Sequence, residues 1–395
     1  MTNRVKIILR SGKDQSPKRF HPWIFSGAIK KMQGDPSIGD MVEVYSNKDE
    51  FLGLGHYSPG SIAVRIISFT QVEDISELLS GRIKGAVDYR QKLGFFDNPD
   101  TNVFRLIHAE GDGLPGLIAD YYNGAVVLQF HSVGMYRNME QITVALKGSL
   151  GDRLRLLYNK SKSTLPYPFN QSLENSYMIE GERSNEVVEN GNRFVVDWED
   201  GQKTGFFNDQ RNSRKLLGTL SGGKSVLNLF AYTGGFSVYA LQGGASQVVT
   251  IDSSSKAIEL ANRNVELNFG QSANHEAFDN DVFNFLAETE TQYDIIISDP
   301  PAFAKHLKVM NNALKGYRRL NEQVLEKIKP GGILFTFSCS QVVSRENFRK
   351  VILAAAANTR RKIRIMYQLT QPPDHPINIY HPESEYLKGL VLQVE

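Results

Sequence analysis

The feature that most constrains the fold is the alternation of short apolar segments with helical segments from about residue 190 onward. Strands that alternate with helices in this way are typical of a parallel sheet covered by helices on both faces. We predict strands at 225–229, 247–251, 275–278, 293–298 and 332–337. The helices between them include 255–267 and 312–328. An α/β architecture with a parallel sheet is therefore expected in this part of the chain.

Two further apolar segments close the sequence, at 366–376 and 386–395. They are too close together for a crossover helix, so we predict that they pair in antiparallel fashion. Five parallel strands followed by such a pair resemble the layout of class I methyltransferases, a Rossmann-like α/β fold.

The rest of the chain is organised differently, and 395 residues exceed what one hydrophobic core usually supports. Residues 1–72 contain short strands with polar turns, and the segments 26–28 and 38–42 resemble the PUA domain, a small RNA-binding β-barrel. Residues 73–188 mix strands with a helix predicted at 74–93. We therefore predict three domains: PUA-like (1–72), central α+β (73–188) and methyltransferase (189–395).

Composition restricts the compartment and the partners. The 45 basic and 43 acidic residues give a net charge of +2, which neither requires nor excludes nucleic acid. Basic residues gather between Arg4 and Arg19 and again at 360–364, where a solvated surface is the simpler interpretation for each cluster alone. The single cysteine, Cys339, excludes an internal disulfide and a multi-cysteine zinc site, and no metal is expected. Because neither a secretory signal nor about 18 consecutive apolar residues occurs, we expect a cytoplasmic protein without a membrane span.

A glycine-rich turn follows the strand at 225–229 and leads into a helix. Glycine lets the backbone approach a ligand, and the next strand ends in Asp252, where a carboxylate can accept both hydroxyls of a ribose. The turn lacks the third glycine of a dinucleotide-binding motif, which disfavours a pyrophosphate and favours S-adenosylmethionine. The cofactor residues predicted around this turn are Asn228, Phe230, Tyr232, Thr233, Gly234 and Gly235.

Asp281 and Val282 follow the third strand of the series. There a carboxylate can accept from the adenine amino group, while the neighbouring side chains enclose the ring. Asp281 is equally suited to capping the helix that begins beside it. Because Asp281 occurs in series with Asp252, the cofactor role is favoured for it.

The fourth strand ends in Asp299-Pro300-Pro301, followed by Phe303. The prolines stop the strand and present Asp299 at the carboxyl edge of the sheet, where ligands of such folds bind. Asp-Pro-Pro followed by an aromatic residue is typical of enzymes that methylate nucleobases. We therefore predict that Asp299 contacts both cofactor and base, with Pro300, Pro301 and Phe303 lining the substrate site.

The fifth strand brings Cys339 to the same edge. A lone cysteine is ordinarily a small buried apolar residue. In this setting its thiolate could attack carbon 6 of a cytosine, which makes carbon 5 reactive toward a methyl donor. We identify no nearby Lys or Arg that would lower its pKa, and no base for the carbon 5 proton.

Taken together, these motifs resemble the 23S ribosomal RNA cytosine-5 methyltransferases that carry a PUA domain. The resemblance spans the whole chain and is strongest at 201–211, 228–236, 299–301, 337–340 and 386–389, with Asp374-His375-Pro376. It implies that Gln210 and Arg211 line the cofactor pocket and that the two N-terminal domains help to bind 23S ribosomal RNA. The chain departs from its relatives at Ala302 and in detail at 381–385.

Three alternatives stay open at this stage. A guanine N-methyltransferase would need no thiolate, so Cys339 favours cytosine over guanine. A non-enzymatic RNA-binding protein is disfavoured by the intact series Asp252, Asp281 and Asp299, and a nicotinamide-dependent oxidoreductase by the missing third glycine. A homodimer is also left open.

Overall fold

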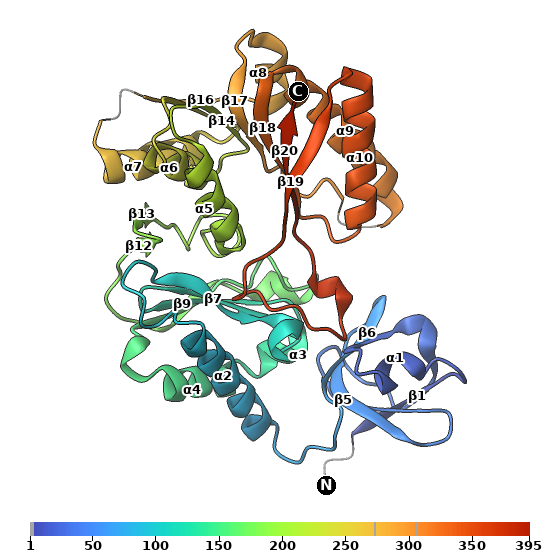
Figure 1. Ribbon diagram of the computed structural model, residues 1–395. Coiled ribbons are helices and arrows are strands. Elements are labelled where there is room, and N and C mark those ends of the chain that lie inside the picture. Colours follow the sequence, from blue (N-terminus) through green and yellow to red (C-terminus); the bar gives the residue numbers. More distant parts are fainter. Residues whose placement is uncertain (1–3, 272–273, 305–306) are drawn as a thin grey trace. The chain divides into compact units, whose positions relative to one another are not determined.

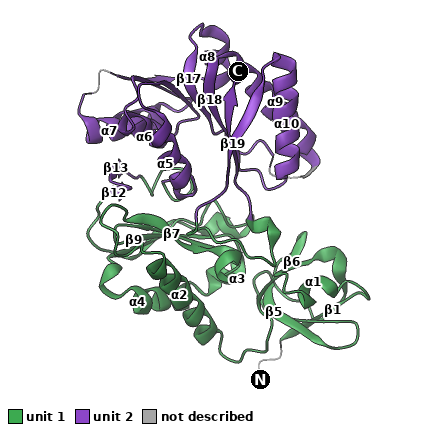
Figure 2. Ribbon diagram, in the orientation of Figure 1, with its two compact units in different colours: residues 1–185, 197–205, 373–384 green, residues 186–196, 206–372, 385–395 purple. Residues whose placement is uncertain are grey.

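The computed structural model describes residues 4–271, 274–304 and 307–395, which form two compact units (Figures 1 and 2). The first unit comprises residues 1–185, 197–205 and 373–384, and the second comprises residues 186–196, 206–372 and 385–395. The first unit contains the segment expected to be PUA-like and all but the last three residues, 186–188, of the segment expected to be central. It also takes in two segments from the range expected to be the methyltransferase domain.

A seven-stranded sheet forms the centre of the second unit, counted over the described residues. Its strand order is β16-β15-β14-β17-β18-β20-β19, with the first five strands parallel and β20 antiparallel to both of its neighbours. The strands are β14 (Ser225–Leu229), β15 (Gln247–Asp252), β16 (His275–Asp279), β17 (Tyr293–Ser298), β18 (Ile328–Ser338), β19 (Ile363–Leu369) and β20 (Lys388–Val394). This is the predicted parallel sheet, and the predicted terminal antiparallel pair is confirmed.

Helices cover both faces of this sheet (Figure 1) because successive strand residues point to opposite sides. On β14, Val226 packs into a core with α5 and α6, whereas Leu227 packs into the core with α8, α9 and α10. Burial on both faces explains why the central strands β14, β15 and β17 are largely apolar. The helices are α5 (Arg211–Leu220), α6 (Gly235–Gln242), α7 (Ser255–Phe269), α8 (Val282–Glu288), α9 (Met310–Glu326) and α10 (Arg345–Thr359); a hairpin of β12 (Glu186–Glu189) and β13 (Asn192–Val195) completes the unit.

The first unit contains two separate sheets within the described residues. One has the order β2-β6-β5-β4-β1-β3 and contains the short strands predicted within residues 1–72. The other has the order β11-β10-β9-β8-β7, with α2 and α4 contributing to the same core. The bounds are β1 (Val5–Leu9), α1 (Gln15–Lys18), β2 (Trp23–Phe25), β3 (Ile29–Gln33), β4 (Met41–Tyr45), β5 (Phe51–Tyr57), β6 (Ile62–Ser68), α2 (Ile75–Lys92), β7 (Val103–His108), β8 (Leu117–Tyr122), β9 (Ala125–Phe130), α3 (Val133–Arg137), α4 (Met139–Leu150), β10 (Leu156–Asn159) and β11 (Ser176–Ile179).

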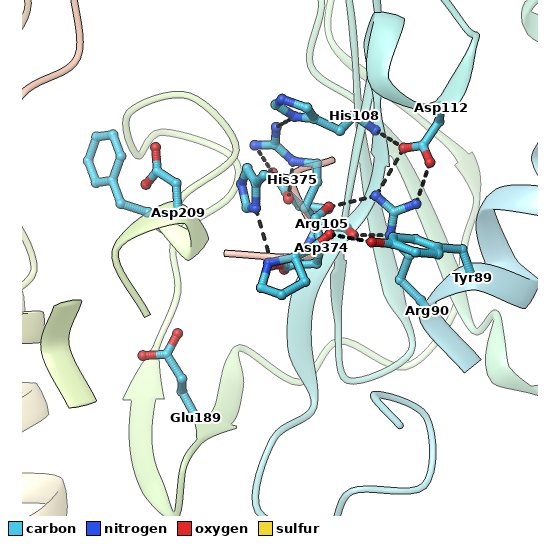
Figure 3. A network of polar contacts seen from close by, with 12 residues as sticks. Tyr89, Arg90, Arg105, His108, Asp112, Glu189, Asp209, Asp374 and His375 are labelled. Atoms are coloured by element: carbon cyan, nitrogen blue, oxygen red, sulfur yellow. Dashed lines mark hydrogen bonds and ion pairs between the residues drawn. The ribbon is translucent and has the colours of Figure 1, made fainter. Parts of the chain in front are cut away.

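Polar contacts attach the late segment 373–384 to the first unit (Figure 3). Arg90 is fully buried in α2 and forms a bidentate ion pair with Asp112, with N···O distances of 2.6 and 2.9 Å. The same guanidinium donates to the backbone carbonyl of Asp374 (2.6 Å), whose carboxylate accepts from the Arg105 N–H (2.9 Å). Thr204 attaches segment 197–205 in a similar way, because its hydroxyl donates to Asp120 (2.6 Å).

The carboxylate of Asp294, at the start of β17, gives the second unit a pH-dependent contribution to stability. Burial alone would raise its pKa, but hydrogen bonds from the Ser225 N–H (2.9 Å) and hydroxyl (2.7 Å) and from the Lys329 ammonium (3.0 Å) outweigh burial. The pKa falls from 3.8 to about 2. A depressed pKa stabilises the fold above the unfolded value and loses that effect as the pH falls toward 2.

We therefore expect Asp294→Asn to lower the free energy of unfolding at pH 7 by about 2 kcal/mol, following the pKa shift. The difference between the two proteins should shrink as the pH falls from 4 toward 2. Urea unfolding followed by far-ultraviolet circular dichroism at several pH values measures it. A difference that stays constant over this pH range would contradict the assignment.

None of the helices in the described part of the chain is both long and apolar enough to cross a membrane.

Candidate active site

The loop after β14 carries an unusual backbone conformation. Phe230 and Tyr232 have φ values of 56° and 47°, which residues other than glycine rarely adopt, and Gly234 has a φ of 72°. Gly234 also lies against α7: a Cβ at this position would come within 2.8 Å of the Ala261 Cβ. Such strain is found where a fold holds its backbone for a ligand, and it occurs at the turn that the sequence identified.

Asp252, at the end of β15, holds this loop in place. One carboxylate oxygen accepts from the Tyr232 N–H (2.8 Å) and the other from the Ser254 N–H (3.0 Å). The side chain is only partly buried, so each oxygen keeps a lone pair that a ligand hydroxyl can use. Thr233 and Gly235, which follow Tyr232 in the chain, are buried.

Gln210 and Asp299, which are 89 residues apart, meet at the carboxyl edge of the sheet. The Gln210 Nε2 donates to the Asp299 Oδ2 at 2.9 Å. The Gln210 Oε1 is buried and has no hydrogen-bond partner among the described residues. It can therefore accept a hydrogen bond from a ligand. Arg211 is buried next to it at the start of α5.

Asn228 points into the core between β14 and α6. Its Nδ2 donates to the Ser237 hydroxyl (2.9 Å), which is bonded to Thr250 (2.7 Å), and Thr250 contacts the His275 Nε2 (2.8 Å). Burial lowers the pKa of His275 to about 4, so its ring is neutral at pH 7. This arrangement gives Asn228 a packing role, and its predicted contact with the cofactor stays a prediction.

Asp281 caps α8, the alternative that the sequence left open. Its Oδ1 accepts from the N–H groups of Phe283 (2.9 Å) and Asn284 (3.1 Å). The carboxylate is otherwise exposed, whereas Val282 is buried. Capping explains the aspartate fully, and its contact with adenine stays a prediction.

Cys339 lies directly after β18, against the Asp-Pro-Pro turn. Its Sγ is 4.0 Å from the Pro300 carbonyl oxygen, and the residue is half-buried. Phe303 is also half-buried and its ring lies 4.5 Å from that of Tyr317, while Pro301 is exposed. The fold therefore brings the predicted nucleophile to the predicted base-binding turn.

Lys388 is the residue at this edge that sequence reasoning missed. Its side chain is buried, and its ammonium donates to the carbonyl oxygens of Ser340 (2.6 Å) and Tyr386 (2.7 Å). Burial lowers the pKa of Lys388 to about 8, while the neighbouring Cys339 works against that decrease. The resemblance to the family already included the segment 386–389, which contains Lys388. Only the pairing of β20 with β18 shows that this lysine lies beside Cys339.

One group of potential metal ligands occurs among the described residues, outside this site: His21, His381 and Glu383, with ligand atoms within 4.8 Å of one another. The His21 Nδ1 accepts from the Trp23 N–H (3.2 Å), so in the neutral ring Nε2 carries the proton and donates to Glu383 (3.2 Å). His21 is thus hydrogen-bonded to both Trp23 and Glu383 in this arrangement.

The polar groups at the edge of the sheet suit S-adenosylmethionine. Asp252 offers acceptors for ribose hydroxyls, and the buried Gln210 Oε1 and the Asp299 carboxylate offer acceptors for an ammonium group. The strained loop between them would bring backbone close to the ligand. These residues would hold the cofactor, which supplies an electrophilic methyl group when bound.

Comparisons with known proteins agree with this fold and site. The S-adenosylmethionine-dependent methyltransferase family model matches residues 117–390, and a PUA-like domain model matches residues 7–69. Proteins named ribosomal RNA large subunit methyltransferase I from Pseudoalteromonas atlantica and Escherichia coli are 38% and 35% identical, over 98% and 99% of this chain and 99% of each relative.

A solved structure of an S-adenosylmethionine-dependent methyltransferase from Streptococcus mutans has a TM-score of 0.86 and 26% identity, over 98% of this chain and 99% of that one. A methyltransferase crystallised with SAH matches with the same TM-score, identity and coverage. The family model covers well over half of the chain, and the relatives match it nearly from end to end. The chain therefore belongs to the S-adenosylmethionine-dependent methyltransferase family and carries a PUA-like domain in its N-terminal part.

Proposed function

We propose that this enzyme methylates carbon 5 of a cytosine in 23S ribosomal RNA, with Cys339 as the nucleophile. The observation that carries the proposal is the position of the only cysteine, at the end of β18 and 4.0 Å from the Pro300 carbonyl oxygen. Asp299, in the same turn, is hydrogen-bonded to Gln210. The names of the relatives support a large-subunit ribosomal RNA as substrate.

The chemistry needs each of these groups. Attack of the Cys339 thiolate on carbon 6 forms an S–C bond and gives carbon 5 the electron density that it lacks in cytosine. Asp299 accepts from the amino group of the base and so holds the base in place. After carbon 5 has gained the methyl group, loss of its proton to a base expels the thiolate and restores the double bond.

The first unit offers a surface for the RNA. A pocket of about 460 Å³ is lined by Lys13 and by the aromatic residues Trp23 and Phe25, with Phe25 45% exposed. Aromatic faces next to cations bind unpaired bases by stacking and by charge. With an RNA substrate of this kind, we expect the enzyme to act in the cytoplasm.

Product analysis tests this proposal. The protein is incubated with methyl-labelled S-adenosylmethionine and unmodified 23S ribosomal RNA, and the digested nucleosides are separated. We expect label in 5-methylcytidine. Label in a methylated guanosine would keep the fold and the cofactor but would replace the proposed reaction with guanine N-methylation, in which Cys339 has no chemical role.

A further inference from the structure

Strand pairing places a lysine beside the proposed nucleophile. β20 runs antiparallel to β18 with Ser338 opposite Lys388, so the lysine lies level with the last residue before Cys339. The two strands approach closely because the next residue is Gly389, where a Cβ would come within 2.6 Å of the Phe337 ring. A larger residue at position 389 would push β20, and with it Lys388, away from the cysteine.

The ammonium of Lys388 is oriented by backbone groups on both sides. Its hydrogen bonds to the Ser340 and Tyr386 carbonyls use two of its three N–H groups. No carboxylate lies within ion-pair distance of Nζ in the part of the chain that the structure describes. A buried cation without a carboxylate partner is costly unless a negative charge forms nearby.

We propose that Lys388 is the positioning residue that stabilises the thiolate form of Cys339. The proposal rests on the proposed function, which requires a thiolate. The thiol proton passes to solvent and the lysine keeps its own protons, so the step creates a thiolate beside an existing ammonium. The resulting pair compensates both the buried cation and the otherwise unfavourable anion.

Other charged groups near the pair do not replace Lys388. Arg345, at the start of α10, is paired with Glu385, so these two side chains largely cancel. Tyr317 from α9 is fully buried, and burial raises its pKa, so its phenol is neutral at pH 7. Asp299 is negative and opposes ionisation of the cysteine. Among the residues that the structure describes, Lys388 is therefore the cation placed to favour the thiolate.

Alkylation of Cys339 by iodoacetamide tests the proposal directly, because the chain contains no second cysteine. The rate is measured from pH 5 to pH 10 in the full-length protein. For the wild type we expect the midpoint of the rate–pH profile to lie at least one pH unit below about 8.5, the ordinary pKa of a cysteine thiol. A midpoint at or above that value would overturn the proposal without the use of any variant.

Variants then assign the effect to the lysine. In Lys388→Met we expect alkylation at pH 7 to be about tenfold slower, equal to a shift of one pKa unit, with the two rates converging above pH 9.5. Lys388→Arg should restore most of the rate. Lys329→Met, which removes a partly exposed lysine from β18, the strand that leads to Cys339, is the matched control and should leave the profile unchanged.

An unchanged alkylation profile in a folded Lys388→Met protein would refute the role of the lysine. Calorimetric measurement of SAH binding establishes that each variant is folded. Because alkylation uses no RNA, the outcome is separate from that of the proposed function: label in guanosine would refute cytosine methylation, whereas the profile would still report on the Lys388–Cys339 pair.

Discussion

Replacement of Cys339 by alanine should reduce methyl transfer roughly 10⁴-fold or more, because no other described side chain at this edge of the sheet can form the covalent bond to carbon 6. The affinity for SAH should be unchanged, since Asp252 and Gln210 are untouched. Initial rates with labelled cofactor and calorimetry measure the two quantities.

Covalent trapping sharpens this prediction. RNA that contains 5-fluorocytidine carries no proton to be removed from carbon 5, so the adduct persists after methyl transfer. We expect a band of protein-linked RNA on a denaturing gel with the wild type and none with Cys339→Ala. A variant that kept full activity would exclude the covalent route and reduce Cys339 to a packing residue.

Replacement of Asp112 by alanine should destabilise the first unit by about 3–5 kcal/mol, the cost of leaving a buried charge without its partner. Arg90 is fully buried, and Asp112 neutralises it through both carboxylate oxygens (Figure 3). Urea unfolding followed by tryptophan fluorescence is suited to this test, because Trp23 and Trp198, the two tryptophans of the chain, both belong to this unit.

A matched control is available on the same helix. Lys84 and Asp88 form an exposed ion pair one turn apart in α2. Asp88→Ala should change the free energy of unfolding by less than about 0.5 kcal/mol, because solvent screens the pair. If Asp112→Ala were as mild as Asp88→Ala, the buried pair would contribute no more than an exposed one.

Local periodicity accounts for the parts of the fold that the sequence predicted. The strand predicted at 225–229 is β14, and the helix predicted at 255–267 is α7, which extends to Phe269. Both segments bury a regular apolar pattern against the core. The short strand β3 was missed, because its residues Ile29–Gln33 are mostly exposed and carry no alternation of apolar and polar side chains.

Pairing across long distances explains what the sequence did not reveal about the site. Cys339 and Asp299 could be placed because each directly ends a parallel strand, and such ends share one edge of the sheet. Lys388 could not be placed, because its position beside Cys339 depends on the register between β18 and β20. Asp281 shows a different difficulty, because the same residue fits both a helix cap and a ligand-binding pattern, and the sequence cannot separate the two.

The return of segment 373–384 to the first unit has a consequence for biosynthesis. The chain passes between the units at 185/186, 196/197, 205/206, 372/373 and 384/385. Arg105 donates its N–H to a carboxylate 269 residues later, which leaves the ribosome roughly ten seconds to a minute after it. Until then Arg90 and Arg105 lack the acceptors that Asp374 supplies. The first unit is thus completed only after most of the second has been synthesised, and the two cannot mature one after the other.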